Sequence, residues 1–257
     1  MRTAISIFPV LMRRFVELAL ATRAQALVSI FTTVAAAGTG LATFYFFYER
    51  VGTLGGLDAR QGYLLYGTYL LIDGITAAIL TPVLAKLPSY VKSGHLDSFL
   101  LNPVGLRGAL ILASPNPWRL TDVAAGVSII GLALPADVTT HGVVLASIAL
   151  LCGFALIFSI WTLVVALIMS YLRVDNVGQL FTFGISLVKF PIGSYPAWLK
   201  VFLSFVVPLG LSAGVPVSAL NESGTLNGIA YLACYSLCSF FVSTIVLRMV
   251  ANFYQET

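Results

Sequence analysis

The stretch from Gly142 to Leu172, GVVLASIALLCGFALIFSIWTLVVALIMSYL, decides the fold because its 31 residues include no charge. As an α-helix it would be about 46 Å long at about 1.5 Å per residue, which exceeds the roughly 30 Å hydrocarbon core of a bilayer. The stretch therefore predicts a membrane-spanning helix that tilts or projects into the cytoplasm.

The remainder of the chain has the same character. Hydrophobic residues make up 59% of the sequence and charged residues only 9%, whereas soluble domains carry about 25% charged residues. We therefore expect an all-α polytopic membrane helical bundle forming a single domain over residues 1–257. Six transmembrane helices are predicted, near residues 26–48, 61–85, 117–134, 142–172, 177–190 and 226–247.

An N-terminal amphipathic segment, residues 1–23, precedes the first predicted span. On a helical wheel Ile5, Phe8 and Met12 share one face, and Arg13 and Arg14 lie on another. This pattern predicts an interfacial elbow helix, with Pro9 marking its first turn or a kink. A frayed basic tail is the alternative interpretation.

Two further segments are predicted not to span. Residues 86–119 combine four basic residues with four prolines and are expected to form a cytoplasmic loop. Residues 192–224 are apolar but broken by Pro196, Pro208 and Pro216, which predicts an outer re-entrant hairpin before the last span. If residues 201–218 instead crossed fully, there would be seven spans.

The basic residues set the predicted orientation. With the N-terminus inside, ten of the fourteen Lys and Arg residues are cytoplasmic, which follows the positive-inside rule. We expect a multi-pass protein of the cell inner (plasma) membrane with both termini in the cytoplasm. The ten are Arg2, Arg13, Arg14, Arg23, Lys86, Lys92, Arg107, Arg119, Arg173 and Arg248.

Catalytic residues are not predicted. The sequence has no phosphate-binding loop ending in Gly-Lys-Ser/Thr, so we do not expect ATP hydrolysis by this chain alone. His95 and His141 are predicted to lie on opposite sides of the membrane, and no metal site is expected. No resident cofactor is expected. A nucleic-acid partner is not expected either, because the basic residues form no dense tract.

Asp73 is the most informative residue predicted to lie inside the membrane. A carboxylate within a span costs roughly 2.5–3.5 kcal/mol on insertion scales and normally faces the bundle interior or water. It could serve a transported cation, a proton or a partner helix in a substrate path. Alternatively, it is hydrogen-bonded at a helix break formed with Gly74.

The predicted inner loop contains a short amphipathic pattern between residues 90 and 103. Val91, Leu96, Phe99 and Leu100 provide an apolar face that would dock in a groove of a cytoplasmic partner. The alternative is an interfacial helix lying on membrane lipid.

The segment KSGHLDSFLLNP, from Lys92 to Pro103, resembles the membrane subunit of an ABC-2-type transporter. FPIGSYPAWL, from Phe190 to Leu199, and FVVP, from Phe205 to Pro208, are similar to segments that precede the last helix in that family. The resemblance covers nearly the whole chain and implies a permease of the type V exporter architecture.

That resemblance implies roles for two sets of residues. It places Gly94, Leu96 and Asp97 in a coupling helix that contacts the ATPase, together with Val91, His95, Phe99 and Leu100 of the amphipathic pattern. It places Tyr195, Pro196, Trp198 and Pro208 in the re-entrant hairpin.

The implied partners are two copies of a separate ABC ATPase subunit, which would hold ATP and Mg, and a second permease, identical or related. The implied activity is outward transport of a drug, an organic cation, a lipid or a glycan. Two other classes remain open: an ion- or proton-coupled secondary transporter using Asp73, and a membrane scaffold without transport.

Overall fold

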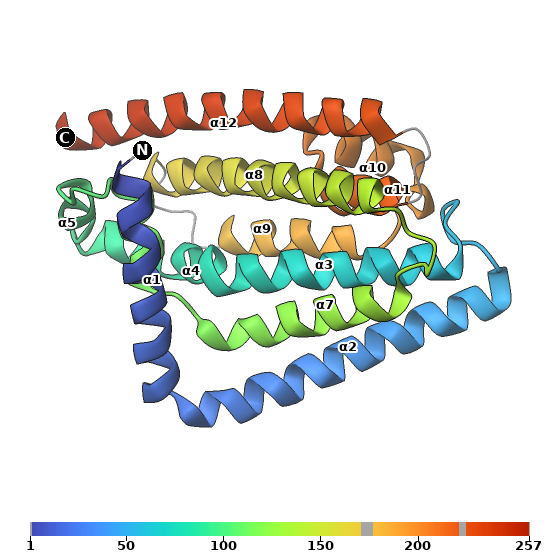
Figure 1. Cartoon of the computed structure of the whole chain (residues 1–257). Helices are drawn as coiled ribbons and strands as arrows, with labels where there is room; N and C mark the ends of the chain where they lie inside the picture. The colour runs from blue at the N-terminus through green and yellow to red at the C-terminus, as the bar shows by residue number, and fades with distance from the viewer. Residues whose placement is uncertain (1, 171–176, 221–224, 257) are drawn as a thin grey trace.

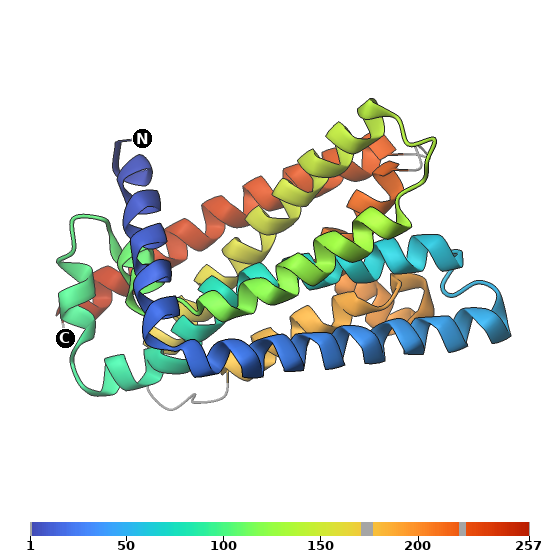
Figure 2. The same cartoon turned by 60° about the horizontal axis from the view of Figure 1, so that its bottom comes forward.

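The computed structural model describes residues 2–170, 177–220 and 225–256. The predicted all-α class is confirmed, since 86% of the chain is helical and the described residues form no strand. The long helices lie side by side along one axis, and α1 runs across one end of the bundle (Figure 1). The view in Figure 2 shows the same crossing of α1 from another side.

The helices follow one another with short connections. Their bounds are α1 (Arg2–Ala21), α2 (Arg23–Val51), α3 (Ala59–Ile79), α4 (Thr81–Lys92), α5 (Leu96–Leu100), α6 (Leu106–Ala113), α7 (Leu120–Ala133), α8 (Thr140–Ser170), α9 (Val177–Ser186), α10 (Ala197–Val201), α11 (Leu209–Leu220) and α12 (Thr225–Glu256). Short turns named η1 (Pro117–Arg119), η3 (Ile192–Ser194) and η4 (Phe202–Val206) lie between them.

Four helical stretches are long and apolar enough to cross a membrane. They are Gln25–Val51 in α2, Ala59–Lys92 in α3 and α4, Thr140–Ser170 in α8 and Leu226–Phe253 in α12. The predicted third and fifth spans are shorter. The third consists of the 14 residues of α7, which follow η1. The fifth begins with the 10 residues of α9, and Pro191 follows its helical stretch. Six full spans therefore stay a prediction.

Both ends of the chain lie at the same end of the bundle, beside α5 and α6 (Figure 1). An odd number of full crossings would place the two termini at opposite ends of the bundle. Their common end agrees with an even number of spans. The position of α1 across that end (Figure 1) is compatible with the predicted interfacial elbow helix. The link between α8 and α9, which contains Arg173, lies outside the described residues.

Glycines bring α3 and α7 into close contact. A Cβ added at Gly126 would lie 2.7 Å from the Gly67 carbonyl oxygen, and one at Gly74 would lie 2.7 Å from the Val123 nitrogen. Small residues of this kind let helix backbones approach closely inside membranes. The alternative that Asp73 lies at a helix break formed with Gly74 is wrong, because α3 continues to Ile79 and Gly74 supports packing instead.

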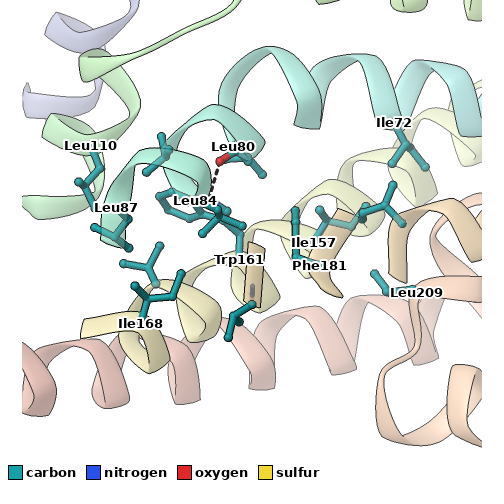
Figure 3. Packing of buried hydrophobic residues seen from close by; sticks show 14 of the residues in the cluster. Ile72, Leu80, Leu84, Leu87, Leu110, Ile157, Trp161, Ile168, Phe181 and Leu209 are labelled. Carbon is teal, nitrogen blue, oxygen red and sulfur yellow. Dashed lines mark hydrogen bonds between the residues drawn. The ribbon is translucent and has the colours of Figure 1, made fainter. Parts of the chain in front are cut away.

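The second span breaks at Leu80, where α3 gives way to α4. Pro82 has no N–H to donate to the Ala78 carbonyl. That carbonyl accepts instead from the Asn116 backbone N–H at 2.7 Å. The Leu80 carbonyl accepts from Trp161 Nε1 of α8 at 3.0 Å, as Figure 3 shows. Groups from distant elements thus satisfy the backbone at this break.

The main core surrounds that break. Trp161 is fully buried among aliphatic side chains from α3, α4, α8, α9 and α11 (Figure 3). Leu96 of α5 and Leu110 of α6 belong to the same cluster. The core therefore reaches from the middle of the bundle into the predicted cytoplasmic loop.

The segment before the last helix contains a sharp bend. The stretch Ala197–Phe205 and α11 are inclined by 83° to each other, with Pro208 at the break. A straight span over residues 201–218 is therefore not formed, whereas the bend is compatible with the predicted re-entrant hairpin. Of the two glycines on α11, Gly210 packs against Ile192, whereas a Cβ at Gly214 would meet no atom within 4 Å.

Candidate coupling segment and intramembrane ion cluster

The predicted coupling residues lie in the α4–α6 segment, residues 81–113, at the end of the bundle shared by both termini (Figure 1). Gly94 ends α4 with a positive φ of 70°, a conformation that favours glycine. Its N–H donates to the Val91 carbonyl at 3.3 Å, and α5 starts two residues later. The sequence Ser-Gly-His thus forms a tight turn between two helices.

The predicted coupling residues divide into buried and exposed groups. Leu96 is fully buried in the core and Val91 is nearly so, and the half-buried Phe99 ring lies 5.1 Å from the Tyr90 ring. Gly94, His95 and Asp97 are exposed, and Leu100 is half-buried. Leu96 and Val91 therefore anchor the segment to its own bundle, which leaves the polar turn as the surface open to a partner.

Two local contacts order this turn. His95 Nδ1 lies 2.8 Å from Ser93 Oγ, and Ser98 Oγ donates to the His95 carbonyl at 2.7 Å. The Asp97 carboxylate sits in the first turn of α5, where a negative charge is favoured by the helix dipole. Among the described residues, no group of three His, Cys, Asp or Glu side chains is placed to hold a metal ion.

Arg107, which the sequence analysis assigned only to the loop charge, reaches from α6 to the long helices. Its Nη2 donates to Thr244 Oγ1 of α12 at 2.9 Å. Its guanidinium carbon lies 5.4 Å from the centre of the Phe240 ring and 5.8 Å from that of Phe158 on α8. Burial, with a smaller contribution from Arg248, lowers the pKa of the Arg107 guanidinium.

Asp73 belongs to a partly buried ion cluster, defined here as Asp73, Arg119 and Asp122, of which only Asp122 is buried. Arg119 Nη2 lies 3.5 Å from Asp73 Oδ2, and Nη1 lies 3.1 Å from Asp122 Oδ2. The latter contact is an ion pair without hydrogen-bond geometry, since Asp122 Oδ2 has no hydrogen-bond partner. The cluster carries two carboxylates for one guanidinium.

The ion cluster also fixes α2. Thr33 Oγ1 of α2 donates to Asp122 Oδ1 at 2.5 Å, and Ser29 Oγ donates to the Trp118 carbonyl at 2.7 Å. Sequence reasoning singled out Asp73 and missed its partners. The available signal was a second carboxylate, Asp122, inside an apolar stretch and three residues after Arg119.

A groove of about 450 Å³ lies between α4 and α9. Four of its lining residues, Thr81, Gln179, Thr182 and Ser186, carry hydroxyl or amide groups. Leu84, Ala85, Gly178 and Phe183 complete the lining. A groove with this composition offers both apolar contact and hydrogen bonds within the bundle, and the sequence analysis did not anticipate it.

The predicted hairpin residues occupy different environments. Tyr195 Oη donates to the Leu187 carbonyl at 2.7 Å, and burial raises the pKa of the Tyr195 phenol. Pro196 directly precedes α10, Pro208 lies at the 83° bend, and the Trp198 side chain is exposed. Tyr195 thus fastens the start of the hairpin to the end of the preceding helical stretch.

These features define a polytopic helical membrane protein of the permease type, with a structured loop at one end of its bundle. The chain belongs to the ABC-2 family, because the family model described as ABC-2 family transporter protein matches residues 34–257. No curated protein and no solved structure matches the chain. The family resemblance noted from the sequence is confirmed, and permeases of this family are membrane components that generally work with an ATPase subunit.

Proposed function

We propose that this chain is the transmembrane permease subunit of an ATP-driven ABC exporter that moves a hydrophobic or amphipathic substrate outward. Two separate ATPase subunits would hold ATP and Mg, and a second permease, identical or related, would complete the path. The single permease domain, residues 1–257, would lie in the inner (plasma) membrane with both termini cytoplasmic.

The observation that carries this proposal is the division of the α4–α6 segment. Its exposed turn, Gly94, His95 and Asp97, offers a polar contact surface, while Leu96 beside it is fully buried in the main core. A push on the exposed turn would therefore displace the buried anchor and the helices packed around it. Close-packed interiors transmit such displacements because they have few voids in which to absorb them.

The groove between α4 and α9 is the better candidate for a substrate path. Thr182 and Gln179 are exposed there, beside the exposed apolar side chain of Phe183. This mixture suits a molecule with apolar bulk and hydrogen-bonding groups. Asp73 is less suited to meet a substrate, because it is ion-paired with Arg119 and its side chain is only 18% exposed.

The test uses the permease reconstituted with its ATPase in lipid nanodiscs. We expect the double substitution Gly94→Val with Asp97→Ala to reduce permease-dependent ATP hydrolysis at least about fivefold, as a coupling of 1–3 kcal/mol predicts. Insertion and folding should persist, since both residues are exposed.

The matched control is Gly52→Val with Asp137→Ala. Gly52 has a positive φ of 74° in open surroundings, like Gly94, and Asp137 is exposed on the loop that precedes α8. We expect the control to keep normal hydrolysis. Unchanged hydrolysis in the Gly94 and Asp97 variant, or failure of any ATPase to co-purify, would refute the proposal.

The second candidate is a secondary transporter, favoured by the excess carboxylate of the ion cluster. It predicts proton- or cation-driven uptake by liposomes that contain the purified chain alone, and loss of that flux in Asp73→Asn. Flux that needs an ATPase and ATP would reject it.

A further inference from the structure

Arg107 is an unusual residue for its position. It stands in α6, LRGALILA, whose other side chains are apolar, and it extends toward α8 and α12. Its Nε is buried without a hydrogen-bond partner. A buried donor left without a partner costs free energy, and an apolar side chain would avoid that cost. Packing alone therefore does not explain an arginine here.

The contacts of Arg107 are directional. Thr244 Oγ1 accepts from Arg107 Nη2 at 2.9 Å and donates to the Phe240 carbonyl one turn earlier at 2.7 Å. The guanidinium also lies within cation–π distance of the Phe240 ring. Arg107 thus contacts the hydroxyl and the ring of a single turn of α12, the hydroxyl is bonded to the backbone of that turn, and Phe158 adds a contact to α8.

The Arg107 contact joins the α4–α6 segment to two long helices of the bundle. At one side is α6, whose Leu110 packs in the same core cluster as Leu96 of α5. At the other are α8 and α12, the two longest apolar helices after α3–α4, which run side by side toward the far end of the bundle (Figure 1). A displacement of α6 along the bundle would be carried into both helices.

We propose that Arg107 is the positioning residue that makes the α4–α6 segment and α12 move as one unit when the ATPase acts on the exposed turn. The inference rests on the proposed exporter function. It assigns to Arg107 a role in transmission, separate from ATPase contact and from substrate contact.

The experiment compares hydrogen exchange at the outer ends of α8 and α12 between nucleotide-free and ATP–vanadate-trapped complexes in nanodiscs. In the unmodified complex, trapping should change exchange at these ends. In Arg107→Ala we expect ATPase binding and basal hydrolysis to persist, while the nucleotide-driven change at the outer ends falls at least about fivefold. Lys86→Ala, which removes an exposed cation from α4, is the control and should behave as the unmodified complex.

Two further variants separate transmission from folding. Thr244→Val keeps the shape of the side chain, removes the hydroxyl that Arg107 binds, and should lose part of the nucleotide-driven change. In a chain with Cys152, Cys234 and Cys238 replaced by alanine, Arg107→Cys with Thr244→Cys should lose the change. A bifunctional thiosulfonate of arginine length, bridging the two introduced thiols, should restore it.

The outcomes test the exporter proposal and the role of Arg107 separately. No nucleotide-driven change in the unmodified complex would refute the exporter proposal itself. A normal change in Arg107→Ala or in Thr244→Val, with a normal change in the unmodified complex, would refute only the role of Arg107. A tether that blocks the change in place of restoring it would show that α6 and α12 move apart, and would also overturn the inference.

Discussion

The two proline breaks of this bundle, called inner and outer here after the predicted topology, are held by their surroundings to different degrees. At the inner break, near Pro82, the freed Ala78 carbonyl accepts from Asn116 and the Leu80 carbonyl accepts from Trp161, so distant elements satisfy the backbone. At the outer break, near Pro208, most bonds are local, and the one bond from a distant element is long and exposed: Tyr231 Oη of α12 donates to the Ser204 carbonyl at 3.3 Å. The Val207 N–H donates to the Phe202 carbonyl at 3.0 Å, and Ser212 Oγ donates to the Leu209 carbonyl at 2.6 Å.

The two breaks also differ in how deeply the tryptophan near each one is buried. Trp161 at the inner break is fully buried, whereas Trp198 near the outer break is 71% exposed. A break held by two distant elements must move with them, while a break with mainly local bonds and one long bond to α12 is held less firmly. The inner break is thus suited to passing displacement between the α4–α6 segment and the core, and the outer break to a more loosely held hairpin.

The largest expected effect comes from removing the indole at the inner break. Trp161→Ala should lower the free energy of unfolding by about 3–5 kcal/mol, because it leaves a cavity and removes the donor to Leu80. The measurement is unfolding in mixed micelles followed by circular dichroism. Trp198→Ala is the matched control and should shift stability by no more than about 0.5 kcal/mol, as exposed substitutions do. Equal losses would erase the contrast between the breaks.

Sequence patterns predicted the all-α class and the long apolar helices. They succeeded because hydrocarbon demands long uncharged runs that can be counted directly. The family assignment also followed from short motifs, such as the one around Gly94 and Asp97, and the family model confirms it.

Contacts between elements were not predictable. The pairing of Arg119 with Asp73 depends on how α3 meets η1, and nothing in the 45 residues between them encodes it. The burial of Leu96 within its own bundle was missed for a related reason. An amphipathic face shows that a helix has an apolar partner, but whether that partner is lipid, another protein or the same chain depends on tertiary structure.

The second effect in size tests whether the ion cluster stiffens the region of the inner break. Arg119→Met should destabilise the fold by about 1–2 kcal/mol, a value reduced from that of fully buried pairs because the Arg119 side chain is 37% exposed. The loss arises because Asp73 and Asp122 then face each other without a cation. Adding Asp73→Asn should recover part of it in the same unfolding assay. Further loss in the double variant would show that Asp73 is stabilised by other groups.

A smaller effect isolates the hydrogen bond at the inner break. Trp161→Phe keeps an aromatic ring and removes Nε1, so it should cost about 1 kcal/mol and increase hydrogen exchange at the start of α4. The Leu80 carbonyl would retain only the long 3.4 Å contact to the Leu84 N–H. The comparison with Trp161→Ala separates this bond from the packing of the ring, and a cost equal to that of alanine would mean that the bond dominates.

The last comparison concerns two glycine substitutions, one of them at a contact that supports the outer break. Gly55 and Gly52 both have positive φ, 59° and 74°, so alanine at either site carries a similar backbone penalty of about 1 kcal/mol. At Gly55, however, the new Cβ would also lie 2.8 Å from the Ser194 nitrogen, whereas at Gly52 it would meet no atom within 4 Å. Gly55→Ala should therefore cost more than Gly52→Ala and should raise hydrogen exchange in η3 and α10. Because the outer break is bonded mainly within its own segment and to α12, exchange in α4 and α8 should stay unchanged in both variants. A change there would show that the two breaks are coupled after all.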